Sequence, residues 1–211
     1  MIWVATSPEA IPGEVSHISS LLYAGLDVLL LRKPGFSAAQ YEQLLQGIDP
    51  LFFSRIMIAG QPSLVEKYGL RGLHMSEAFR TSVNSAGFAD TAYQLSTSIH
   101  TEQIETWSFQ PAEQHAVFVE VQHVMPSLKM WHHLILGPVF NSISKPGYTG
   151  RLQEMKNIPA NTLAIGGITQ HNIGHLKPMG FCGAVLLGAI WNDPFNAVPT
   201  YQSIYAAWNR T

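Results

Sequence analysis

Residues 133–147 read HLILGPVFNSISKPG, and residues 163–172 read LAIGGITQHN. In each segment a short apolar run leads straight into turn-forming residues, Gly137-Pro138 and a hydroxyl-rich loop in the first and Gly166-Gly167 in the second. Apolar runs with little polar alternation are typical of strands that are covered on both faces of a parallel sheet. The two segments therefore predict neighbouring parallel strands with binding loops at their carboxyl ends.

Further apolar runs complete a series of eight candidate strands. They are Ile2–Thr6, Val28–Arg32, Ile56–Ala59, Gly72–His74, Tyr93–Ser98, Leu134–Pro138, Thr162–Gly166 and Ala184–Gly188. Segments with helical periodicity lie between them, at Glu14–Ala24, Ser37–Ile48 with Ser37 as N-cap, Pro62–Tyr68, Thr101–Trp107, His171–Met179 and Val198–Trp208. This alternation predicts an α/β protein with the (β/α)8 TIM-barrel fold. A doubly wound open sheet is the alternative, but Thr6-Ser7-Pro8 lacks the glycine-rich turn that usually follows its first strand.

The whole chain, residues 1–211, is expected to form one barrel domain, because single α/β barrels often have about 200 to 250 residues. The segment 108–131 is longer than one helix and two loops require, and it contains another apolar run at Val117–Val121. We expect an enlarged excursion between the fifth and sixth strands, serving either as a lid or as a subunit contact. In the second case the chain would be a homo-oligomer, and apolar side chains exposed there would favour it.

Composition excludes several classes of protein. Hydrophobic residues make up 46% of the chain and charged residues 12%, which argues against disorder. The formal net charge is −2 and the basic residues are dispersed, so nucleic acid is not an expected partner. No apolar run approaches the roughly 20 residues of a membrane span, and the opening MIWVATSPEA lacks the pattern of a signal peptide, so we expect no membrane partner and a cytoplasmic location. Cys182 is the only cysteine, which excludes an intrachain disulfide and a thiolate zinc site.

Glycines at the ends of two predicted strands indicate an anionic ligand. Ligands of (β/α)8 barrels bind at the carboxyl ends of the strands, and phosphate often lies by the loops after strands seven and eight. Gly166-Gly167 and Leu187-Gly188 end these two strands, and glycine lets backbone N–H groups approach an anion closely. The alternative is that the glycines only form tight turns. Because two such sites lie on adjacent strands, we expect a small phosphate ester as the ligand.

Cations and histidines also fall at strand ends. Lys145 follows the sixth strand and Arg32-Lys33 follow the second, so all three are expected to face the same mouth of the barrel. A flexible ammonium is a good point-charge partner for phosphate, although a solvated loop lysine is the alternative for Lys145. His74 and His100 each serve either as a general acid or base, or as a histidine packed into the barrel rim.

These segments together resemble a known family. GPVFNSISK at 137–145, AIGGI at 164–168 and GAVLLGAI at 183–190 resemble the thiamine-phosphate synthase and thiazole tautomerase family. The resemblance extends to LDVLLLRK at 26–33, RGLHMSE at 71–77 and STSIHT at 96–101, and covers most of the chain. It implies a (β/α)8 barrel of thiamine biosynthesis. The synthase joins hydroxymethylpyrimidine diphosphate to a thiazole phosphate and releases diphosphate, using Mg2+.

The resemblance also implies roles for particular residues. Ser142, Ser144, Gly166 or Gly167, Leu187 and Gly188 match positions that hold the thiazole phosphate, and Arg32, Ser98 and Lys145 match positions that touch the pyrimidine diphosphate. The expected catalytic residues are Lys145, Arg32 and Ser98 from this resemblance, together with His100 at its strand end. The expected substrate-binding residues are Lys33, His74, Ser142, Ser144, Gly166, Gly167, Leu187 and Gly188.

The chain departs from the family at the magnesium ligands. The family has Asn-Asp-Arg after strand three, where this chain has Ala59-Gly60-Gln61, and the last aspartate of the family's His-Leu-Gly-Gln-Glu-Asp is Phe79 here. In the family's Arg-Glu-Lys motif after strand two, the lysine corresponds to Pro34 here, and Lys33 is the nearest substitute. The glutamine that opens the same motif corresponds to Leu30. Mg2+ is held by carboxylates and substrate phosphates. Neither aspartate is present, and Glu77, two residues before Phe79, is the nearest carboxylate. We therefore expect a metal to bind only through diphosphate, water and Glu77, and we expect an altered synthase chemistry.

Two other functions remain open. The tautomerase branch acts on a thiazole carboxylate phosphate and needs no Mg2+, but its proton-transferring histidine corresponds to Pro138. His100 or His74 would then have to act as the base. The third hypothesis is a barrel that binds a phosphate ester without catalysis.

Overall fold

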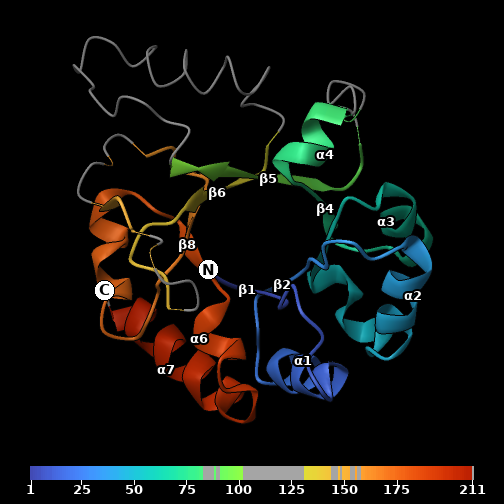
Figure 1. Ribbon diagram of the computed structural model, residues 1–211, viewed down its shortest axis with the longest axis horizontal. Helices are drawn as coiled ribbons and strands as arrows, with labels where there is room; N and C mark the ends of the chain where they lie inside the picture. The colour runs from blue at the N-terminus through green and yellow to red at the C-terminus, as the bar shows by residue number, and fades with distance from the viewer. Residues whose placement is uncertain are drawn as a thin grey trace.

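The barrel is closed and entirely parallel. The computed structural model describes residues 1–82, 88, 91–101, 131–143, 147, 149–152, 155 and 158–210. Its strands follow the order of the chain around the ring: β1 (Ile2–Ala5), β2 (Val28–Leu31), β3 (Ile56–Ala59), β4 (Gly72–Met75), β5 (Gln94–His100), β6 (His133–Gly137), β7 (Thr162–Ile165) and β8 (Gly183–Leu186). The strands form an inner ring with the helices outside it (Figure 1). The predicted (β/α)8 barrel is confirmed, and the open-sheet alternative is wrong.

Alternate residues of each strand face the interior of the barrel. β1 pairs with both β2 and β8, which closes the ring. The interior is filled mainly by apolar side chains from six strands, namely Trp3, Ala5, Val28, Leu30, Met57, Ile135, Leu163 and Val185. His74 and Ser96, paired in register on β4 and β5, add polar groups that are fully buried. This packed interior makes the barrel a core and not a pore.

The connecting segments form the outer layer. They are α1 (Glu14–Tyr23), α2 (Ala38–Gln46), η1 (Pro50–Arg55), α3 (Pro62–Tyr68), α4 (Glu77–Ser82), η7 (Ile173–His175), η8 (Lys177–Met179), α6 (Gly188–Trp191), η9 (Pro194–Asn196) and α7 (Ala197–Arg210), where η marks a 3-10 turn. Ser37 is the N-cap of α2, as predicted, because its hydroxyl accepts from the backbone of Gln40 in a capping box. The apolar faces of the helices pack on the outer face of the barrel in one large core.

The predicted helix at His171–Met179 is wrong, because this stretch forms the two short turns η7 and η8. Pro178 has no N–H to donate, and its ring disfavours the α conformation of the preceding residue. Gly174 weakens a helix here further. The sequence patterns also missed α4 and α6, which are short.

Two other expectations concern chain that the structure does not describe. The predicted helix at Thr101–Trp107 lies outside the described residues except for Thr101, and the enlarged segment 108–131 lies outside them except for Trp131. Within the described ranges, none of the helices has the length and apolarity that a membrane crossing requires.

Candidate functional site at the mouth of the barrel

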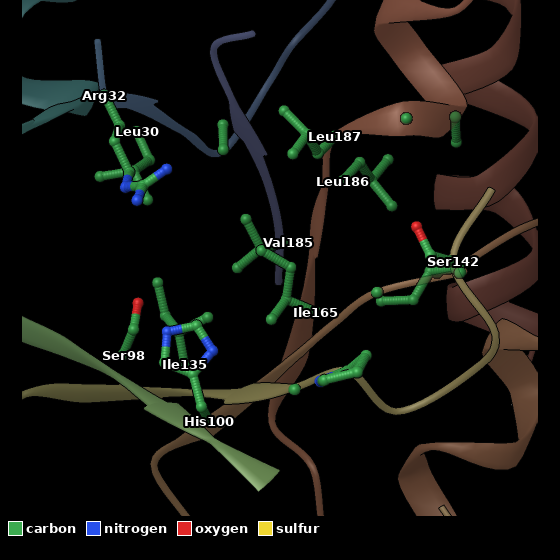
Figure 2. Close-up of a pocket in the computed structure, with 18 of the residues that line it drawn as sticks. Leu30, Arg32, Ser98, His100, Ile135, Ser142, Ile165, Val185, Leu186 and Leu187 are labelled. Carbon is green, nitrogen blue, oxygen red and sulfur yellow. The ribbon is translucent and has the colours of Figure 1, made fainter. Parts of the chain in front are cut away.

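A cavity of about 230 Å³ opens at the carboxyl ends of the strands. Loops that follow six of the strands contribute to its walls, and their side chains converge on it (Figure 2). The predicted site residues that line it are Arg32, Ser98, His100, Ser142, Gly166, Gly167, Leu187 and Gly188. Residues that are far apart in the sequence are thus brought to one place.

The middle of the cavity is apolar. Leu30, Ile135, Ile165 and Val185 line it from four different strands. Figure 2 shows Arg32, Ser98 and His100, with Leu30 and Ile135 beside them, on one side of Val185 and Ile165, and Ser142 on the other side. Such an arrangement suits a ligand with a flat or apolar centre and polar groups at both ends, because pockets of this kind place a few polar groups around an apolar lining.

The glycine side of the cavity presents backbone amides. Gly166 and Gly167 have φ angles of 100° and 65°, which are left-handed conformations that glycine adopts without strain. The carbonyl of Gly166 accepts from Phe140 N at 3.2 Å, and that of Gly167 accepts from Asn172 Nδ2 at 2.8 Å. Within the described part of the chain, the N–H groups of Gly166 and Gly167 donate no hydrogen bond. They are therefore available to an anion.

The same two glycines are required for packing. A Cβ on Gly166 would lie 2.8 Å from Pro138 Cα, and one on Gly167 would lie 2.2 Å from Asn141 O, both in the loop after β6. The reading that these glycines form tight turns and the reading that they bind an anion are therefore compatible. One backbone conformation allows the close approach of the β6 loop and leaves the two amides without an acceptor among the described residues.

Gly167→Ala is expected to lower the free energy of unfolding by about 2 kcal/mol more than Gly25→Ala, because only the first substitution forces a side chain against backbone. Gly25 is the matched control, since its φ is 94° and its added Cβ would meet nothing within 4 Å. Urea unfolding of both variants measures the difference. Equal destabilisation would show that the β6 loop yields to a methyl group at no cost.

Arg32 is fixed at the mouth by its own backbone. The hydroxyl of Thr6, just after β1, accepts from Arg32 N and donates to Arg32 O, both at 2.9 Å. The exposed Arg32 side chain extends from this anchored backbone along the cavity wall (Figure 2). Sequence reasoning missed Thr6, which also lines the cavity. Its place directly after a strand, in a turn-forming segment, is the signal that could have found it.

Lys33 does not face the cavity, so the expectation that all three cations face the mouth is wrong for this residue. Its side chain is buried, and its ammonium lies 2.6 Å from Glu14 Oε2 and donates to Glu9 O at 2.8 Å. The Tyr41 hydroxyl contacts both backbone polar groups of Lys33. Burial raises the pKa of the Glu14 carboxyl, and the hydrogen bond from Lys33 opposes this shift. Lys33 is therefore a structural cation that ties the loop after β2 to α1.

His74 lies beneath the cavity and does not line it. Its ring is fully buried, with Nδ1 3.0 Å from Ser96 Oγ and Nε2 3.1 Å from Ser98 Oγ. Burial, with the nearby charges of Arg32 and Arg80, lowers the pKa of His74 to about 3. A base whose two nitrogens are both engaged, and which resists protonation this strongly, is poorly suited to abstract a proton directly from a ligand.

His100 is the histidine that reaches the cavity. It ends β5, is exposed, and lines the wall near Ser98 (Figure 2). Ser76 and Glu77, where α4 begins, line the same cavity. Glu77 brings a carboxylate to the mouth of the barrel, whereas the sequence indicated it only as the acidic residue nearest to a lost metal ligand.

Two expected site residues, Ser144 and Lys145, lie outside the described residues. Their assignments stay predictions. Ser142, in the same loop, is described and lines the cavity.

The positions that correspond to magnesium ligands do not fit that ion. Gly60 and Phe79 lie close together, since a Cβ on Gly60 would be 3.6 Å from Phe79 Cδ2. Neither the aromatic ring of Phe79 nor Gly60 provides a side-chain oxygen, and Mg2+ is held mainly by carboxylates and phosphates. Among the residues that the structure describes, no cluster of three or more His, Cys, Asp or Glu side chains is arranged to hold a metal.

No protein-family model matches the chain, and no curated protein matches its sequence. Solved structures do match its fold. Thiamine phosphate pyrophosphorylase from Bacteroides thetaiotaomicron superposes with a TM-score of 0.73 at 23% identity, covering 99% of this chain and 97% of that one. The enzyme of that name from Pyrococcus furiosus gives 0.67 at 13% identity, covering 99% and 95%.

Other barrels are similar as well. A 3-hexulose-6-phosphate synthase superposes with a TM-score of 0.59 at 13% identity, covering 98% of both chains. At these identities the likeness shows the fold alone. The chain therefore shares its barrel fold with thiamine phosphate pyrophosphorylases and with several other enzymes.

Proposed function

We propose that this protein is an enzyme of the thiamine-phosphate synthase type, which binds a thiazole phosphate and joins it to a pyrimidine diphosphate. The observation that carries the proposal is the arrangement of one cavity. The amides of Gly166 and Gly167, which donate no hydrogen bond within the described residues, line this cavity together with the cationic side chain of Arg32 and a set of apolar side chains. The likeness in fold to two thiamine phosphate pyrophosphorylases supports it.

Each part of the cavity has a task in such a reaction. The glycine amides, with Ser142, hold the phosphate of the thiazole, because converging N–H groups form an anion-binding concavity. The apolar middle excludes water and packs against both rings, which brings the reacting atoms together. Arg32 and Ser98 face the diphosphate and offset the charge that grows on it as the bond to the pyrimidine breaks.

At the two positions that correspond to the family's magnesium ligands, Gly60 and Phe79 offer such a metal no side-chain oxygen. Because Gly60 and Phe79 do not fit Mg2+, we assign no step to a protein-bound metal. Arg32 and the predicted Lys145 would carry the charge of the departing diphosphate instead. The deciding experiment is formation of thiamine phosphate from the two substrates, measured with Mg2+ and with a chelator. Formation under either condition supports the proposal, and its absence under both contradicts it.

Arg32→Gln is expected to weaken binding of hydroxymethylpyrimidine diphosphate about 30-fold, because a hydrogen bond to a charged group contributes about 1.5–3 kcal/mol. Calorimetric titration measures this. Arg55→Gln is the matched control, since Arg55 ends η1, outside the cavity, and contacts Leu26 O. It should leave the dissociation constant unchanged. Equal affinities of both variants would remove Arg32 from the binding site.

A second candidate is a thiazole tautomerase-like isomerase. The specific observation in its favour is that His100 lines the cavity while the positions of both metal carboxylates are apolar. Isomerisation of a thiazole carboxylate phosphate that is lost in His100→Ala, without any synthase activity, would establish it. Tight binding of the phosphate ester with neither reaction would instead identify a non-catalytic binder.

A further inference from the structure

Three side chains form a continuous hydrogen-bonded chain from the barrel interior to the cavity. Ser96 Oγ lies 3.0 Å from His74 Nδ1, and His74 Nε2 lies 3.1 Å from Ser98 Oγ. Ser96 and His74 are fully buried, whereas Ser98 lines the cavity. The register of β4 against β5, which pairs His74 with Ser96, holds the three groups in line.

The imidazole at the centre of this chain is neutral. Burial is the main cause, and the charges of Arg32 at the end of β2 and of Arg80 on α4 act in the same direction to lower the pKa of His74. Glu77, at the start of α4, offsets part of the charge of Arg80. A neutral imidazole has one N–H donor and one acceptor nitrogen. It therefore donates to one serine and accepts from the other.

This property determines what Ser98 offers to a ligand. When Nε2 accepts from Ser98, the serine oxygen presents only lone pairs to the cavity. When Nε2 carries the proton and donates to Ser98, the serine hydroxyl is free to donate to a ligand. In both arrangements the serine oxygen stays anchored to the ring, which limits its rotation.

Packing alone does not account for these groups. The barrel interior is otherwise mainly apolar, and burying a polar group is costly unless it is hydrogen-bonded. An apolar side chain at position 74 would avoid that cost, yet here an imidazole and a serine are buried so that one hydroxyl reaches the cavity. We propose that His74 is a positioning residue, which holds the Ser98 hydroxyl toward the ligand as the middle member of a neutral Ser96–His74–Ser98 relay.

The proposal rests on the proposed function only in that an anionic ligand occupies this cavity. A binding test uses inorganic diphosphate in metal-free buffer, titrated calorimetrically into the wild type, Ser98→Ala, His74→Gln and the double variant. We expect each single substitution to raise the dissociation constant about tenfold, and the double variant to bind as Ser98→Ala does. The proposal is wrong if the two losses of affinity multiply in the double variant, or if His74→Gln binds diphosphate as tightly as the wild type does. If His74→Gln does not fold, Ser96→Ala takes its place. Ser96→Ala should raise the dissociation constant about threefold in the otherwise wild-type protein, and it should have no effect in a protein that already carries Ser98→Ala.

A spectroscopic test needs no ligand. In protein labelled with 15N-histidine, His74 should keep the nitrogen shifts of a neutral ring from pH 8 to pH 5. Ser98→Ala should shift its Nε2 signal, and the control Ser142→Ala, at the opposite wall, should not. An imidazolium signal at pH 5, or no response to Ser98→Ala, would refute the relay. If diphosphate does not bind the wild type, the proposed function loses its support and this test alone decides the role of His74.

Discussion

Replacing Lys33 with methionine is expected to lower the free energy of unfolding by about 3–5 kcal/mol, which is the usual cost of removing one partner of a buried ion pair. The substitution leaves the Glu14 carboxylate buried without the ammonium that lies 2.6 Å from it. Within the described residues, Glu14 Oε1 already lacks a hydrogen-bond partner. Glu14 would then either stay charged without compensation or take up a proton. Urea unfolding at pH 7 measures the loss.

Two further variants make this prediction specific. The double variant Lys33→Met/Glu14→Leu should recover most of the stability, because replacing a whole buried pair by apolar groups is often close to neutral. Lys67→Met is the control, since the pair of Lys67 with Glu42 lies at the surface and Lys67 is 59% exposed. Its loss should leave the unfolding curve nearly unchanged. A double variant no more stable than Lys33→Met would mean that Lys33 acts through its contacts with Glu9 and not through its charge.

The sequence predicted the barrel because every strand carries its own signal. Most of these strands are apolar runs buried on both faces, so the local pattern and the fold require the same residues. All eight strands lie within a residue or two of their predicted bounds. The helix at His171–Met179 was predicted from periodicity alone. In that stretch Pro178 prevents a continuous helix, and the residues form two short 3-10 turns instead.

The site was predictable where backbone position determines it. Gly166, Gly167 and Gly188 end their strands, and a closed parallel barrel brings such ends together. The sequence did not show which side chain of an adjacent pair faces the cavity. Arg32 and Lys33 are adjacent in the sequence, but consecutive residues at a strand end point to opposite sides, so that one lines the cavity and the other pairs with Glu14. The partners of His74 on β5 depend on register, which no local pattern reveals.

Acid is expected to destabilise the protein through His74 by about 3 kcal/mol between pH 7 and pH 4, since one pKa unit corresponds to 1.36 kcal/mol. Burial, together with the charges of Arg32 and Arg80, lowers the pKa of His74 in the folded protein from 6.5 to about 3. Between these two values the unfolded chain binds a proton that the folded protein does not. The stability that depends on a neutral His74 is therefore fully present well above pH 6.5, and it is lost progressively as the pH falls from 6.5 toward 3.

The difference between two variants isolates this effect from the other groups that titrate in the same range. Urea unfolding at pH 7 and pH 4 should show that His74→Gln loses about 3 kcal/mol less than the wild type over this interval, because it has no imidazole to protonate on unfolding. His175→Gln, which removes an exposed histidine from η7, should lose as much as the wild type. If His74→Gln were as sensitive to acid as the wild type, the ring would have to accept a proton in the folded state. The neutral relay that connects it to Ser98 could then not persist at low pH.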